Sequence, residues 1–113
     1  MSKDFVLHIL DLLGVLGNVT TRKMFGGQGI YLNNHMFAIV VDDVLYLKTD
    51  PQSEARFQKH GLSPFSYQRQ GKSISMSYYH APDEALENPE EMRQWATLAY
   101  LAALRSSNQK VKK

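Results

Sequence analysis

The residues most suggestive of chemistry are three glycines within four positions of the segment R-K-M-F-G-G-Q-G-I-Y, Arg22 to Tyr31. Glycine-rich loops bind phosphate groups when their backbone N–H groups lie at the start of a helix. This segment lacks Gly-x-Gly-x-x-Gly spacing, no Lys-Ser or Lys-Thr pair follows it, and the next residues are strand-like. We therefore predict that Gly26, Gly27 and Gly29 provide positive φ angles or a bulge between two strands.

The remaining residue types that often carry catalysis or bind metals do not form a recognisable pattern. No two histidines have the helical spacing that presents two imidazoles to one metal ion; they are His8, His35, His60 and His80. Asp42 and Asp43 are adjacent in a predicted tight turn, which is favoured over a catalytic carboxylate pair. With no cysteine and no Gly-x-Ser-x-Gly motif, we predict a non-enzyme that needs no cofactor or metal.

Tyrosines and cations recur in the predicted strands, and this combination can stack single-stranded bases. Two cations precede the glycines and two flank a later hairpin: Arg22, Lys23, Arg69 and Lys72. The sequence has no ribonucleoprotein motif, however, and residues 1–104 carry nine basic and 11 acidic side chains. Tyrosine packing at sheet edges is therefore favoured over base stacking.

Positive charge is concentrated at the C-terminal end. Residues 105–113 carry four of the 13 lysines and arginines and no acid. We predict one domain over residues 1–104 and a flexible basic tail over residues 105–113. Direct nucleic-acid binding, the alternative function, would use this tail and the aromatic strand residues; its candidate contacts are Arg105, Lys110, Lys112 and Lys113.

The same sequence predicts a cytoplasmic protein. It has no cysteine for disulfides, its first residues include an acid, and its longest apolar stretches are far below the ~20 residues of a membrane span. We expect neither a secretory signal nor a transmembrane helix.

Three helices are predicted from apolar spacing and capping residues. The first carries an apolar stripe over residues 5–16, with Ser2 as N-cap; the second spans residues 52–60 after Asp50 and Pro51. The third begins with Asn88 as cap and presents Trp95 and several alanines on one face. Additional leucines widen this apolar face, which predicts a homodimer through Leu98, Leu101 or an outward sheet face.

Six β-rich runs separate these helices, joined in part by short turns. They cover residues 19–25, 30–32, 36–41, 44–48, 65–70 and 73–79. Short hairpin turns favour antiparallel pairing. The predicted fold is therefore an α+β two-layer domain with a mainly antiparallel sheet, in the order α-β(4)-α-β(2)-α, with an N-terminal, a middle and a C-terminal helix.

The glycine segment also resembles a family signature. R-x-M-F-G-G-x-G-x-Y is similar to a motif in the N-terminal domain of TfoX/Sxy-type competence regulators. The likeness continues in F-A-I-V-V-D-D-V-L-Y-L-K, P-F-S-Y and M-S-Y-Y-H-A-P, and in the last helix. The motif residues are Arg22, Met24, Phe25, Gly26, Gly27, Gly29, Tyr31, Lys48, Pro64, Phe65, Tyr78, Tyr79 and Trp95.

This resemblance implies a two-layer fold and a role in transcriptional control of competence for DNA uptake, exerted with the cyclic-AMP receptor protein. Full-length family regulators have a further helical C-terminal domain, and this chain is similar only to their first half. Activation of competence genes therefore does not carry over directly. We expect a homodimeric interaction domain that binds a protein of the transcription machinery; direct nucleic-acid binding is left open.

Overall fold

The computed structural model describes residues 3–24, 26–69 and 72–111. Its elements follow the predicted order, with two short additions, the 3₁₀ helix η1 and the helix α3. They are α1 (Lys3–Leu13), η1 (Gly14–Leu16), β1 (Val19–Met24), β2 (Gly27–Leu32), β3 (His35–Val41), β4 (Val44–Lys48), α2 (Glu54–Lys59), β5 (Pro64–Arg69), β6 (Lys72–His80), α3 (Asp83–Glu87) and α4 (Pro89–Val111). The predicted α+β class is confirmed.

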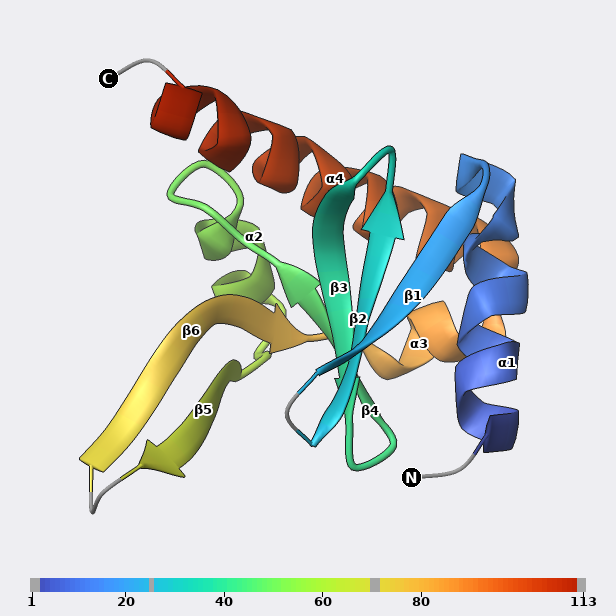
Figure 1. The fold of residues 1–113 in the computed structure, drawn as a ribbon, viewed down its shortest axis with the longest axis horizontal. Coiled ribbons are helices and arrows are strands. Elements are labelled where there is room, and N and C mark those ends of the chain that lie inside the picture. The colour runs from blue at the N-terminus through green and yellow to red at the C-terminus, as the bar shows by residue number, and fades with distance from the viewer. Residues whose placement is uncertain (1–2, 25, 70–71, 112–113) are drawn as a thin grey trace.

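The six strands form one antiparallel sheet in the order β1-β2-β3-β4-β6-β5. Two-residue turns join β2 to β3 and β3 to β4, and all four turn residues have positive φ angles: Asn33, Asn34, Asp42 and Asp43. Asn and Asp tolerate this conformation better than most residues. β6 pairs with β4 only near its end, so the β5–β6 hairpin projects away from the rest of the domain (Figure 1).

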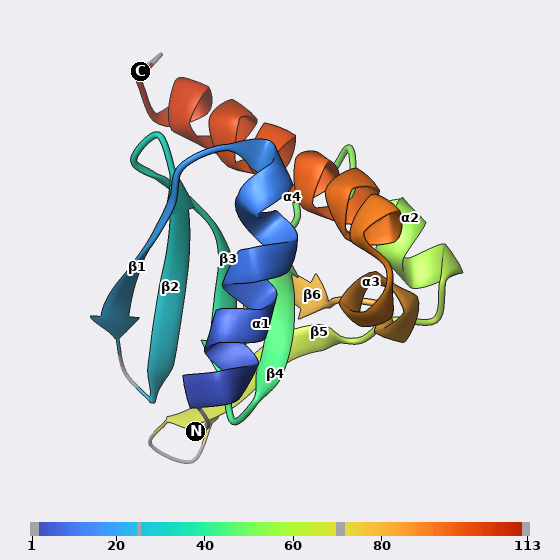
Figure 2. The same cartoon turned by 90° about the vertical axis from the view of Figure 1, so that its right-hand side faces the viewer.

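All four helices contribute side chains to a single core on one face of the sheet. α1 and α4 lie across this face (Figures 1 and 2), and α2 and α3 add Phe57 and Ala85. The apolar stripe of α1 is buried there through Ile9 and Leu13, both 0% exposed. We call the opposite surface of the sheet the outer face.

A β-bulge lets the central strand β3 place two consecutive residues in this core. Ile30 pairs with Ala38, but the next residue of β2, Tyr31, pairs with Met36. Phe37 is therefore the extra residue on β3, and both Phe37 and Ala38 belong to the helix-covered core. The change of alternation puts Met36 and Ile39 on the outer face.

The ends of the first two helices differ from the prediction. α1 ends at Leu13 and continues only as η1, while Ser2, its predicted cap, lies outside the described residues. α2 begins at Glu54 instead of Gln52, because Asp50 closes a turn first. The carbonyl of Asp50 accepts hydrogen bonds from the Ser53 and Glu54 N–H groups, at 3.0 and 2.9 Å.

The last helix begins as predicted and ends later than predicted. The Asn88 side chain accepts hydrogen bonds from the N–H groups of Glu90 and Glu91, at 2.8 and 3.1 Å, which confirms the cap. Residues 105–111, the start of the predicted flexible tail, continue α4 to Val111. Arg105 explains part of this extension, because it is anchored to the chain segment before α2.

The anchor is a two-bond ion pair between Arg105 and Asp50. The Nε and Nη2 atoms of Arg105 donate to the two Asp50 carboxylate oxygens, at 2.5 and 3.0 Å. These bonds, with further hydrogen bonds from Ser53, lower the pKa of Asp50 from 3.8 to about 2. The side chain of Asp50 is 9% exposed and that of Arg105 is 36% exposed, so solvent weakens the interaction only in part.

Replacing Arg105 with glutamine is expected to lower the free energy of unfolding at pH 7 by about 1 kcal/mol, after allowance for solvent screening. The folded-state pKa of Asp50 lies below the unfolded one, so this stabilisation is present above about pH 4 and is lost as the pH falls toward 2. Urea unfolding at several pH values tests this. The difference between wild type and variant should shrink steeply between about pH 4 and pH 2, and an undiminished difference at pH 2 would contradict the assignment.

Candidate functional site

The outer face of the sheet carries its own small cluster of apolar and aromatic side chains. Ile39, Phe65 and Tyr78 are buried in it. Four partly buried side chains surround them: Met24, Met36, Val41 and Tyr46. No described helix contributes to this cluster, so the sheet's own side chains cover it and remain partly accessible.

Two cations lie over tyrosine rings on this face. The guanidinium carbon of Arg22 is 5.2 Å from the ring centroid of Tyr31, and Nζ of Lys48 is 5.3 Å from that of Tyr78. Both distances fall within the range of cation–π attraction. Lys48 and Tyr78 also line a hollow of about 360 Å³ that reaches Ser106 and Ser107 of α4. Arg22, Tyr31, Lys48 and Tyr78 of the family signature thus form a surface that is both aromatic and cationic.

The glycine segment has a geometric role, but only one of its three glycines provides a turn conformation. Gly26 has a φ of +65° between β1 and β2. Gly27 and Gly29 lie within β2, so the prediction of positive φ or a bulge is wrong for them. A Cβ atom on Gly29 would lie 2.7 Å from Sδ of Met36 and 3.1 Å from Sδ of Met24. Glycine here leaves room for both methionines on the outer face.

Gly27 has a different neighbour. A Cβ atom on this residue would lie 2.1 Å from the backbone oxygen of Val40 and 2.9 Å from Cγ2 of Val41. A strand, and not a helix, follows these glycines, so the segment has no helix N-terminus to bind an anion. The segment lets β1, β2 and β3 approach closely.

The tyrosine hydroxyls of the outer face are not prepared for acid–base chemistry. Burial raises the pKa of Tyr78 well above its ordinary value, and nearby Tyr31 adds to this effect. Burial also raises the pKa of Tyr46, whose ring lies 4.6 Å from that of Phe65 and 4.7 Å from that of His80. The rings pack, and their hydroxyls stay neutral.

The structure separates the other predicted residues from this face. Tyr79 points into the helix-covered core, where its hydroxyl donates to Glu54 at 2.9 Å and accepts from Gln58 at 3.0 Å. Trp95 is also in that core, and Pro64 begins β5 opposite Tyr79. Tyr79 and Tyr78 therefore lie on opposite faces of the sheet, because successive residues of β6 face opposite sides.

The residues predicted for self-association and nucleic-acid contact are dispersed. Leu98 packs against the core, whereas Leu101 is 43% exposed on α4. Arg105 is paired with Asp50 and is not a free cation. Phe25, Lys112 and Lys113 lie outside the described residues, as does the side chain of Lys110.

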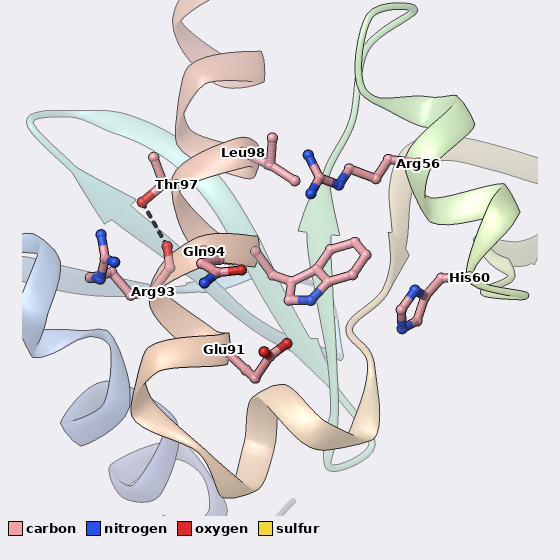
Figure 3. Close-up of a pocket in the computed structure, with 8 residues that line it drawn as sticks. Arg56, His60, Glu91, Arg93, Gln94, Thr97 and Leu98 are labelled. Carbon is pink, nitrogen blue, oxygen red and sulfur yellow. Dashed lines mark hydrogen bonds between the residues drawn. The ribbon is translucent and has the colours of Figure 1, made fainter.

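A second surface feature is a groove of about 420 Å³ between α2 and α4, which we call the α2–α4 groove (Figure 3). It is lined by Arg56, His60, Glu91, Arg93, Gln94, Trp95, Thr97 and Leu98. The His60 ring lies 5.0 Å from the Trp95 ring, edge to face, and its Nε2 is 2.9 Å from Oε2 of Glu84. Sequence reasoning missed this groove because its two walls are about forty positions apart; the wide apolar face of α4 was the available signal.

Metal-binding clusters and membrane-spanning helices are both absent from the described residues. No group of three or more His, Asp or Glu side chains in the described part of the chain is placed to hold a metal ion. None of the helices described is both long and apolar enough to cross a membrane. The surfaces that the structure does present are suited to binding through aromatic, apolar and cationic contacts.

The protein is therefore an α+β domain in which helices cover one face of the sheet. The other face carries an aromatic surface that depends on a glycine. The family model described as the TfoX N-terminal domain matches residues 11–103, so the chain belongs to that family. The resemblance found in the glycine segment is confirmed.

Relatives with assigned names match the same region. The chain is 26% identical to Protein Sxy of Escherichia coli K12 over 98 residues, which cover 87% of this chain and 47% of that protein. It is 33% identical to DNA transformation protein TfoX of Haemophilus influenzae over 79 residues, 69% of this chain and 36% of that protein. It is 31% identical to DNA transformation protein TfoX1 of Aliivibrio fischeri over 64 residues, 57% and 31% respectively. The matches cover less than half of each relative.

Proposed function

We propose that this chain is a non-enzymatic regulatory domain for DNA-uptake competence, which acts by binding a protein of the transcription machinery such as the cyclic-AMP receptor protein. One observation carries the proposal: part of the family signature gathers on the outer face, where Arg22, Met24, Gly29 and Tyr31 meet. The names of two relatives, both DNA transformation proteins, support the biological setting.

The chemistry of the outer face favours a protein ligand. Met24 and Met36 are partly buried, and flexible methionines adapt to the shape of a partner. Arg22 is exposed and lies over the Tyr31 ring, so it is oriented before a partner arrives. Arginine and tyrosine are frequent among the residues that dominate binding energy at protein interfaces.

Binding of the purified cyclic-AMP receptor protein, in the presence of cyclic AMP, to the immobilised full chain tests this proposal. Replacing Arg22 or Tyr31 with alanine is expected to weaken binding about tenfold. The matched control is Lys23→Ala: Lys23 is an exposed cation on the same strand, facing the other way. Circular dichroism verifies that the variants fold. Absence of binding at a concentration of about 100 µM would reject this partner.

Direct nucleic-acid binding, the alternative function, has less support. Tyr78 is 4% exposed with Lys48 over its ring, which leaves little surface for a base to stack on. Arg105 is already paired. Binding of single-stranded DNA with a steep salt dependence, and unchanged in the Arg22 variant, would favour this alternative instead.

The proposal includes self-association. Leu101, the exposed leucine of α4, is its candidate contact, together with Leu98, which is partly buried and packs against the core. Light scattering of the full chain at high protein concentration distinguishes a homodimer from a monomer.

A further inference from the structure

The α2–α4 groove contains one cation that no described acidic group neutralises. Arg93 is bonded to Glu90 and points away from the groove in Figure 3, and His60 is paired with Glu84. Glu91 lies in the first turn of α4, where the positive end of the helix favours a carboxylate. Arg56 makes no ion pair with a described residue and extends from α2 toward Leu98 (Figure 3). The groove therefore presents an unmatched guanidinium.

The floor of the groove adds a second unused donor. The indole N–H of Trp95 makes no hydrogen bond to a described residue, yet no buried polar side-chain atom of the described chain lacks a partner. This N–H is therefore accessible from the groove that Trp95 lines. Next to it lie the partly buried side chain of Leu98 and the exposed amide of Gln94. Hydrogen-bond donors and apolar surface thus lie side by side.

We propose that the α2–α4 groove binds a short peptide segment of a partner protein, in which a carboxylate lies within two residues of a large apolar side chain. The carboxylate pairs with Arg56, and the apolar side chain packs on Trp95 and Leu98. A backbone carbonyl of the segment accepts from the indole N–H. This inference rests on the proposed role in protein binding and adds a second contact surface to it.

Other ligand classes fit the groove less well. An exposed ion pair contributes little by itself, so a small carboxylate would gain too little from Arg56 to bind tightly. A nucleic-acid backbone would bring its phosphates close to Glu91, and Glu84 beside His60 adds a second like charge. A peptide combines one charge with apolar contact and backbone acceptors, which matches all three features of the groove.

Selection of random octapeptides displayed on phage, against the immobilised full chain, identifies the preferred segment. The enriched peptides are expected to carry Asp or Glu within two positions of Leu, Phe or Trp. The best peptide is then synthesised and titrated into the ¹⁵N-labelled chain. Because the sequence has a single tryptophan, one indole N–H signal reports directly on the groove.

Two variants assign the binding to the charge of Arg56. Arg56→Gln is expected to weaken binding of the peptide about fivefold, which is the upper end of the range for an exposed ion pair. Lys59→Gln removes an exposed cation from the same helix without altering the groove lining and should leave the affinity unchanged. A peptide analogue with Gln in place of Glu should lose affinity in the wild type but not in the Arg56 variant.

Several results would overturn the proposal. They are the absence of enriched peptides, enriched peptides without an acidic residue, and an equal indole shift from phosphate or citrate alone. An indole shift that depends only on protein concentration would assign the groove to a second copy. If no peptide is selected while the cyclic-AMP receptor protein still binds in an Arg22-dependent way, only the groove is rejected and the proposed function stands.

Discussion

Alanine in place of Trp95 is expected to lower the free energy of unfolding by about 3–5 kcal/mol. The ring is 6% exposed and has edge-to-face contacts with the rings of Phe57 and His60, both 5.0 Å away between centroids. The ring lies between α2 and α4, so its loss leaves a cavity where these two helices meet. Few other large side chains fill the space between them. Chemical denaturation followed by circular dichroism is the appropriate measurement, because the variant has no tryptophan fluorescence.

The control for this prediction is Leu7→Ala on α1. Leu7 is 62% exposed, and its truncation should change the free energy of unfolding by at most about 0.5 kcal/mol. If Trp95→Ala costs less than about 1.5 kcal/mol, the ring is not a core anchor. The groove described above would then lack a fixed floor as well.

The second large effect is expected for Gly27→Ala, at about 3 kcal/mol or more of lost stability. The new Cβ atom would lie 2.1 Å from the Val40 backbone oxygen, and backbone in the middle of a sheet cannot move aside as a side-chain end can. β2 and β3 would have to separate locally, with loss of ladder hydrogen bonds. Thermal and urea unfolding measure the change.

Substitutions at two other glycines provide a comparison for the size of this effect. Gly29→Ala would place its Cβ atom against the flexible ends of Met36 and Met24, so a smaller loss of about 1–2 kcal/mol is expected. Gly14→Ala meets no atom within 4 Å and should stay within about 0.5 kcal/mol of wild type. Equal effects at Gly14 and Gly27 would show that close approach of β2 to β3 does not explain the glycine.

Features decided by neighbouring residues were predictable. The start of α4 depends on the Asn88 side chain and the N–H groups two and three positions later. The β3–β4 turn depends on Asp42 and Asp43, which adopt positive φ as a tight hairpin requires. In each case the interacting groups lie within four positions, so the pattern in the chain contains the whole interaction.

Features decided by distant residues were not predictable in the same way. The roles of Gly27 and Gly29 depend on Val40 and Met36 of the neighbouring strand, and a bulge at Phe37 sets which side chains face them. The extension of α4 depends in part on Asp50, fifty-five positions before Arg105. Amino-acid composition alone does not reveal such a partner, so the helix was not expected to continue past residue 104.

The amino-acid order thus determined the sequence of main helices and strands, the Asn88 cap, the Asp42–Asp43 turn, and membership of the TfoX N-terminal domain family. Tertiary structure alone decided which signature residues share the outer face and that Arg56 and Trp95 line one groove. The physical reason is range: backbone hydrogen bonds in caps and turns are local, whereas steric contact, burial and charge pairing depend on chain segments that meet only when the sheet and helices pack.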